Sequence, residues 1–187
     1  RTYLKYALDQ YLSGRKSERR KELSLTQNEN QGYLHYYKGI MAMVALDDFI
    51  GTDSLSAALK RFVRDKSYAT GPYPESVEII PYLSAVTPDS LQYLVHDLFE
   101  DIVVYDNRAL SAECRRTDDG KFLTRLTVSS EKFRVDSLGN ENKVPSKDYF
   151  SIGLLDKDDE PVYLNKYLID TDSTTFEIVT DVLPEKA

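Results

Sequence analysis

The sequence has one cysteine and two histidines among 187 residues, and these shortages exclude several kinds of site. One cysteine is too few for a disulfide framework or a zinc cluster held by thiolates. Neither His35 nor His96 has a second histidine four residues away, so the helical motif that binds zinc through paired histidines is missing. The Gly-x-Ser-x-Gly nucleophile turn and glycine-rich phosphate loops are missing too. We therefore expect this chain to bind no metal and to lack a complete catalytic site. Cys114 is interpreted as a partly buried thiol on a strand.

No apolar run approaches the length of a membrane-spanning helix, and 29% of the residues are charged, so we expect a soluble piece. Charge is nearly balanced over residues 1–100, whereas residues 101–187 carry 18 acidic and 12 basic side chains. Such a surface repels phosphate backbones, so no nucleic-acid partner is expected. The basic run Arg15-Lys16 and Arg19-Arg20-Lys21 is interpreted as the solvated end of a helix. The opening residues, from Arg1 to Ala7, include no initiator methionine or signal peptide, which suggests a chain cut from a longer one.

Hydrophobic periodicity predicts an α+β fold in two parts. Apolar residues recur at helical spacing in the first hundred residues and predict five amphipathic helices, over about residues 3–12, 33–50, 53–63, 77–83 and 91–99. From about residue 105 the period changes to two, as in the alternation from Phe122 to Val128, and turn clusters separate the apolar segments. The expected domains are a fragment of a helical bundle over 1–104 and an antiparallel β-sandwich over 105–187.

Tyrosines gather at the start of the most apolar predicted helix, in the segment Gly32-Tyr33-Leu34-His35-Tyr36-Tyr37-Lys38-Gly39. This segment resembles the Tyr-x-Lys-Gly motif of the zinc aminopeptidase family typified by aminopeptidase N, with Tyr36, Lys38 and Gly39 at the matching positions. The resemblance continues through Ala45–Gly51 and Ala57–Phe62. Pro72-Tyr73-Pro74 and Val86-Thr87-Pro88-Asp89 are similar to a bacterial branch of the family, some of whose members are fused to membrane-spanning, transporter-like segments.

The resemblance implies a role for Tyr36, and the position of its neighbours at the start of the helix suggests theirs. In the family, water activated by zinc and a glutamate attacks the first peptide carbonyl, and the motif's tyrosine stabilises the oxyanion, which assigns that catalytic role to Tyr36. His35 is interpreted either as a residue that supports the site or as a histidine whose hydrogen bonds are satisfied at the start of the helix. Lys38 would pair with an acidic residue outside the chain, and Gly39 would let a neighbouring backbone approach closely. From spacing alone, Tyr36 would be interpreted as an amphipathic ring at the start of a helix with an ordinary hydrogen bond, and the resemblance reverses that interpretation. Tyr33 and Tyr37 are interpreted as packing residues.

The sequence is consistent with two functions. The chain is either the C-terminal part of a zinc-dependent aminopeptidase, inactive alone, or a non-catalytic binding or scaffold domain of a membrane-associated, transporter-like protein. The family's zinc-binding His-Glu-x-x-His helix, its glutamate ligand and its amine-binding acidic motif would all precede residue 1. The expected partners are that missing catalytic segment and a peptide substrate. Without the segment, an apolar face drawn from Ile40, Met41, Met43 and Val44 should favour self-association.

Overall fold

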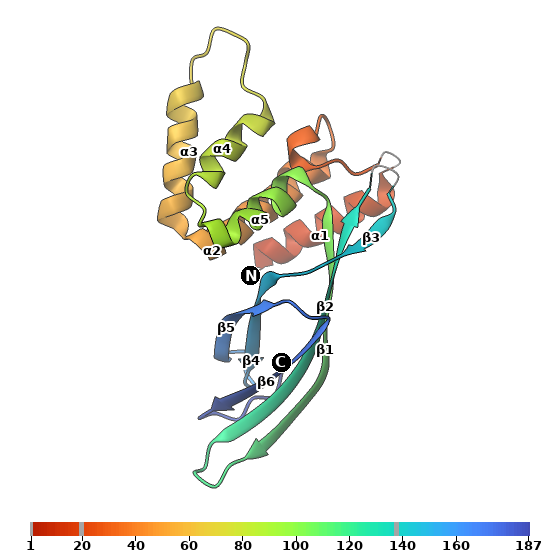
Figure 1. The fold of residues 1–187 in the computed structure, drawn as a ribbon, viewed down its shortest axis with the longest axis vertical. Helices are drawn as coiled ribbons and strands as arrows, with labels where there is room; N and C mark the ends of the chain where they lie inside the picture. The colour runs from red at the N-terminus through yellow and green to blue at the C-terminus, as the bar shows by residue number, and fades with distance from the viewer. Residues whose placement is uncertain (1, 19–20, 137–138) are drawn as a thin grey trace. The chain divides into compact units, whose positions relative to one another are not determined.

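The computed structural model describes residues 2–18, 21–136 and 139–187 (Figure 1). Arg1, and Arg19 and Arg20 of the basic run, lie outside the described residues. The chain forms two compact units, of which the first extends to Val103 and also takes in Val135–Glu141. The second unit comprises Val104–Arg134 and Asn142–Ala187. Helices precede antiparallel strands along the chain, so the fold is α+β, as the sequence predicts.

Helices of three types build the first unit. The α-helices are α1 (Thr2–Ser17), α2 (Gly39–Ile50), α3 (Thr52–Lys66), α4 (Ile80–Ser84) and α5 (Gln92–Val95). Short 3₁₀-helices cover η1 (Leu25–Gln27), η3 (Ser76–Ile79) and η4 (Asp89–Leu91), and π-helices cover η2 (Tyr33–Lys38) and η5 (His96–Glu100). No helix within the described ranges combines the length and the apolar character needed to cross a bilayer.

The core of the first unit lies between α2, α3, α4 and α5. Leu46 of α2 and Leu83 of α4 are fully buried there, and Phe99 of η5 is 4% exposed. Gly51 is the single residue between α2 and α3. Its φ of +82° is a conformation that residues with a Cβ adopt only at a cost, so glycine allows the chain to turn directly from one helix into the next. The apolar stripes that predicted these helices therefore bury one another.

Two antiparallel sheets make up most of the second unit. The strands are β1 (Val103–Arg116), β2 (Phe122–Val135), β3 (Glu141–Val144), β4 (Asp148–Leu155), β5 (Pro161–Ile169) and β6 (Ser173–Thr180). One sheet has the order β1-β2-β3, with β6 also paired to β2, and the other is the pair β4-β5. In register, Leu126 of β2 lies opposite Phe176 of β6, and Ile152 of β4 lies opposite Asn165 of β5.

The core of the second unit draws apolar side chains from both sheets. Leu126 and Ile178 come from the larger sheet, and Ile152, Leu154 and Ile169 come from the smaller one. The period-two pattern thus identified a buried face correctly in β2, where Thr124 and Leu126 are buried and Arg125 is exposed.

The interpretation of Cys114 as a partly buried thiol is wrong in one respect. Cys114 does lie on a strand, β1, but its side chain is exposed. From Asn107 to Arg116 every side chain of β1 is exposed, on both faces of the strand. A hydrophobic period of two identifies a strand, but a strand residue is buried only where other residues pack over it. The described residues do not cover this half of β1.

Candidate functional site

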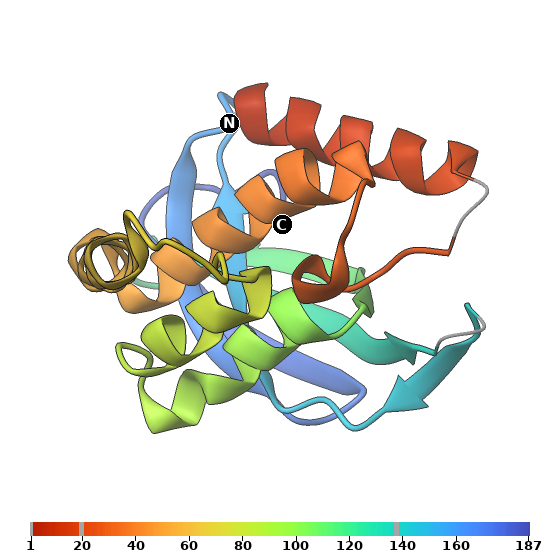
Figure 2. The ribbon, with the colours of Figure 1, turned by 90° about the horizontal axis from the view of Figure 1, so that it is seen from above.

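The segment singled out from the sequence forms a π-helix rather than the first turns of an α-helix. The backbone N–H of Gly39 donates to the carbonyl of Leu34, five residues back, which is the hydrogen bond that defines a π-turn. The sequence predicts one continuous helix from Tyr33 to Ile50, and periodicity cannot distinguish a single widened turn from an α-turn. Such π-turns frequently occur at functional sites. Figure 2 shows α1 running alongside the helix that η2 and α2 form together.

Tyr36 presents its ring outward from this π-helix. Its side chain is among the most exposed of the large side chains, with 64% of its surface accessible. Among the residues that the structure describes, none makes a hydrogen bond with its hydroxyl group. A phenol hydroxyl that the described residues do not engage can donate to an external acceptor.

His35 packs against Tyr36 and is oriented by Asn28. The ring centroids of His35 and Tyr36 are 4.1 Å apart, and the Asn28 side-chain nitrogen lies 3.3 Å from His35 Nδ1. The Asn28 amide oxygen accepts the backbone N–H of Gln31, which identifies the other atom as the NH₂ group. An amide nitrogen only donates, so Nδ1 accepts and a neutral His35 carries its proton on Nε2.

The two neighbouring tyrosines have other contacts. Tyr33 is 9% exposed, and Gln31 Nε2 donates to its hydroxyl at 3.4 Å. Burial and the carboxylates of Glu22 and Glu18 raise the pKa of Tyr33 to about 12. The Tyr37 ring packs edge-on against Tyr6 with centroids 5.9 Å apart. Both tyrosines are less exposed than Tyr36, whose ring contact is with the exposed neighbour His35.

Lys38 has an acidic partner within this chain, which corrects the expectation that its partner lies outside. Lys38 Nζ lies 2.7 Å from Glu22 Oε1, and their side chains are only 13% and 6% exposed. The same carboxylate accepts the Tyr11 hydroxyl at 2.9 Å and lies 2.9 Å from Arg15 Nε. Burial and the nearby Glu22 carboxylate raise the pKa of Tyr11 well above its usual range.

Glu22 is the site residue that the sequence analysis missed. It lies 16 positions before Lys38, in a polar stretch after the basic run, where an isolated acidic residue resembles ordinary surface charge. Residue order does not single it out, because Glu18 follows Arg15 and Lys16 even more closely. A buried carboxylate is tolerated because several donors converge on it.

Among the residues that the structure describes, none lies close enough to Gly39 to explain a glycine. Its backbone is helical, with φ −57° and ψ −45°, and a Cβ built there would lie 3.7 Å from the carbonyl oxygen of Leu34, an ordinary contact distance. The expected close approach of another backbone to Gly39 is therefore not made by the described residues.

His96 belongs to a separate part of the unit, on the second π-helix. Its Nδ1 lies 3.2 Å from Glu100 Oε2, and its Nε2 lies 3.3 Å from Asp101 Oδ2. Over the described ranges, no three side chains from His, Cys, Asp and Glu gather as a metal site would require.

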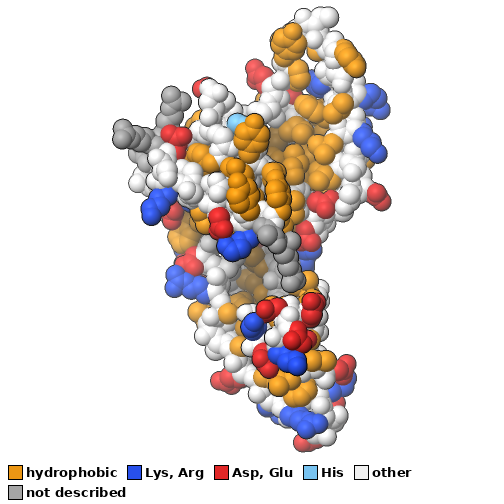
Figure 3. Space-filling model, turned by 180° about the vertical axis from the view of Figure 1, so that it is seen from behind, with side chains coloured by type: hydrophobic (Ala, Val, Ile, Leu, Met, Phe, Trp, Pro, Cys, Tyr) orange, Lys and Arg blue, Asp and Glu red, His pale blue; other side chains and the backbone are white. Residues whose placement is uncertain are grey.

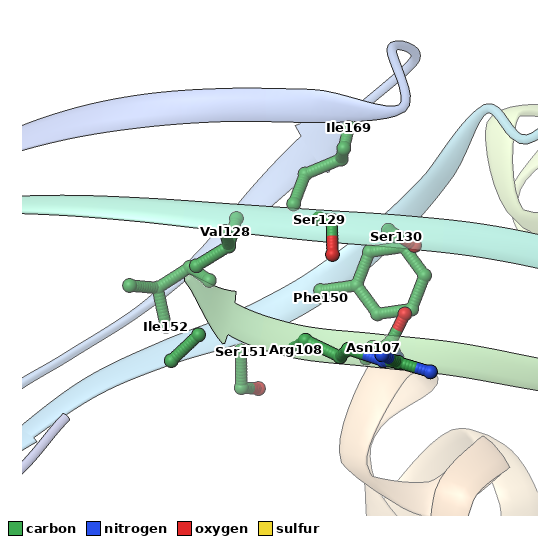
Figure 4. Close-up of a pocket in the computed structure, with 10 residues that line it drawn as sticks. Asn107, Arg108, Val128, Ser129, Ser130, Phe150, Ser151, Ile152 and Ile169 are labelled. Carbon is green, nitrogen blue, oxygen red and sulfur yellow. The ribbon is translucent and has the colours of Figure 1, made fainter. Parts of the chain in front are cut away.

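A cavity of about 200 Å³ lies in the second unit, away from the tyrosine motif in the sequence (Figure 4). Its lining comes from β1, β2, β4 and β5, with Val128, Phe150 and Ile152 as apolar members. Arg108 is the charged lining residue, and Asp106 already holds its guanidinium at 2.6 and 2.8 Å. The cavity thus has no pair of groups suited to acid–base chemistry.

Apolar and tyrosine side chains form an exposed patch on the first unit (Figure 3). Leu4, Leu8 and Leu12 follow one another on one side of α1 and are 37%, 44% and 50% exposed. Of the face expected from the sequence, Val44 is 41% exposed, whereas Met43 packs against the core. The exposed apolar surface therefore owes more to α1 than to α2.

Comparison with known proteins identifies no relative: a scan against models of protein families gives no match, and a search of curated proteins gives none.

Proposed function

We propose that this chain is the C-terminal portion of a zinc-dependent aminopeptidase-like protein of bacterial type, in which Tyr36 stabilises the oxyanion of the reaction. The observation that carries the proposal is the contrast among the three tyrosines of η2. Tyr33 is buried and Tyr37 packs against Tyr6, whereas Tyr36 is 64% exposed and stands in the Tyr-x-Lys-Gly motif. The proposed architecture is a piece of a helical bundle followed by a β-sandwich, supported by the core shared between the two sheets.

The described residues do not fit a zinc site, because they bring no three metal-binding side chains together. A metal would have to be held by another part of the parent protein, and the peptide substrate would lie between that part and Tyr36. The parent would be membrane-anchored in a bacterium, and this chain would supply one wall of the substrate cleft.

Tyr36 would act on the charge that develops during peptide hydrolysis. As the carbonyl becomes tetrahedral, its oxygen gains negative charge and becomes a much stronger hydrogen-bond acceptor. The phenol O–H of Tyr36 would donate to this oxygen, with little effect on the ground state. Removing one such donor costs about 2.7–4 kcal/mol of transition-state stabilisation. The ring contact with His35, at 4.1 Å between centroids, would limit the directions in which the hydroxyl points.

Tyr36→Phe in the full-length parent tests the proposal. We expect kcat to fall by about 10²–10³-fold with little change in KM, because the lost hydrogen bond forms only in the transition state. Stability should barely change, since the ring is kept. Tyr37→Phe is the matched control: it removes the same group from the next residue, whose ring packs against Tyr6. The catalytic role would be refuted by an unchanged kcat in Tyr36→Phe or by equal losses in both variants.

A non-catalytic binding or scaffold domain is the second candidate, and the apolar surface of α1 favours it. Exposed patches of this kind mark protein-interaction sites. On this alternative, Tyr36 and the α1 leucines contact a partner protein, and the full-length parent would hydrolyse no aminoacyl substrate. A large rise in KM without a fall in kcat would indicate that Tyr36 contributes to binding instead of to catalysis.

A further inference from the structure

Glu22 is the point at which three basic or hydroxyl groups of the first unit meet. Its side chain is 6% exposed and belongs to the segment between α1 and η1. Lys38 Nζ lies 2.7 Å and the Tyr11 hydroxyl 2.9 Å from Oε1, and Arg15 Nε lies 2.9 Å from Oε2. A carboxylate this buried requires such partners, because its charge is costly to remove from water.

These contacts reach both ends of the π-helix that carries Tyr36. Lys38 is the last residue of η2 and binds Glu22 directly. Tyr33 is its first residue, and its ring centroid lies 6.1 Å from that of Tyr11, whose hydroxyl donates to Glu22. At this end α1 and η2 pack closely, since a Cβ built on Gly14 of α1 would lie 2.4 Å from Tyr33 Cβ. One carboxylate thus ties both ends of η2 to α1.

The π-turn needs this kind of support. A π-helix is much rarer than an α-helix, so contacts with the surrounding structure must stabilise it here. Returning this segment to α-helical spacing would rotate Lys38 relative to Tyr33, and the two could no longer both face α1. Tyr36 lies between these two residues, so its direction depends on the same constraint.

We propose that Glu22 is a positioning residue: by holding Lys38 and, through Tyr11, Tyr33, it keeps η2 in the π form that points Tyr36 away from the unit. Glu22 touches no reacting atom and acts through the backbone of η2. The catalytic consequence rests on the function proposed above, whereas the structural part does not. The raised pKa of Tyr11 is consistent with this contact, because burial and the Glu22 carboxylate both disfavour the phenolate.

Hydrogen exchange of the 187-residue chain tests the structural part without any assay of activity. Glu22→Gln keeps the shape and removes the charge, so amides of residues 34–39 should exchange at least about tenfold faster. Glu29→Gln is the control, since Glu29 is an exposed acid in the next connection, between η1 and η2, and it should leave exchange unchanged. Unchanged exchange over 34–39 in Glu22→Gln would overturn the proposal. If that variant does not fold, Glu22→Leu combined with Lys38→Met removes both charges, and faster exchange confined to 34–39 remains the expected result.

A double-mutant cycle in the full-length parent tests whether Glu22 acts through Tyr36. Glu22→Gln should lower kcat at least about tenfold alone, but should lower it no further in a Tyr36→Phe background. Equal, additive losses in both backgrounds would overturn the positioning role, because a merely structural defect does not depend on the Tyr36 hydroxyl. If Tyr36→Phe leaves kcat unchanged, the proposed function fails, and exchange over 34–39 alone decides whether Glu22 holds the segment.

Discussion

Replacing Gly39 with alanine should stabilise the isolated chain, although the motif contains glycine at this position. Gly39 is helical, with φ −57° and ψ −45°, so it makes no use of glycine's access to positive φ. Glycine within a helix costs roughly 0.5–1 kcal/mol relative to alanine, because it loses more backbone entropy on folding. The new methyl group would meet its nearest atom, the Leu34 carbonyl oxygen, at 3.7 Å. No clash offsets the gain, and the free energy of unfolding should rise by about 0.5–1 kcal/mol.

Urea unfolding followed by circular dichroism at the helix band measures this change. All helices of the described residues lie in the first unit, so the helical signal reports mainly on the unfolding of that unit. The two-state treatment then needs to hold only for that unit and not for the whole chain. In a thermal experiment the same gain corresponds to a rise in Tm of about 2–8 °C. Gly51→Ala is the matched control, because Gly51 has φ +82° and alanine there should be destabilising. If Gly39→Ala lowers stability, a neighbour of Gly39 must be closer than the structure indicates, and the argument is refuted.

The same substitution in the full-length parent separates two reasons for the glycine. If Gly39 lets a neighbouring backbone of the parent come close, as expected from the sequence, Gly39→Ala should reduce activity while stabilising the chain. Such opposed effects are common where a site gives up stability for function. Unchanged activity would indicate that glycine has no role here beyond helix geometry.

Two further expectations concern high pH and association. Folding raises the pKa of Tyr33 from 10.0 to about 12, so below pH 10 its side chain is neutral in both the folded and the unfolded chain. Between about pH 10 and pH 12 the unfolded chain loses this proton more readily, so the free energy of unfolding should fall as pH rises through this range. Urea titrations across this range should show a smaller fall for Tyr33→Phe, and identical slopes would contradict the assignment. The exposed leucines of α1 should cause dimers or larger species, detectable by light scattering. Leu8→Glu should reverse the association; a chain that is monomeric at all concentrations would refute it.

Periodicity was sufficient for most elements of the fold. The stripes of α2 and α3, and the alternation from Phe122 to Val128, follow directly from residue spacing, because one face of each element must be buried. Periodicity failed where burial depends on a second layer, as at Cys114, and where a single turn widens, as in η2. Neither feature leaves a distinct trace in the order of apolar residues.

The candidate site divides in the same way. The sequence by itself determined the tyrosine-rich segment, the α+β order and the scarcity of metal-binding side chains, since these depend on which residues are present and how they are spaced. Only the tertiary structure decided that Lys38 pairs with Glu22, 16 residues away, and that Tyr36 faces outward while Tyr33 is buried. The spacing of residues along the chain does not indicate which of the many charged side chains becomes buried. That choice is made when α1 packs against η2, because the enclosed carboxylate is stable only where its donors converge.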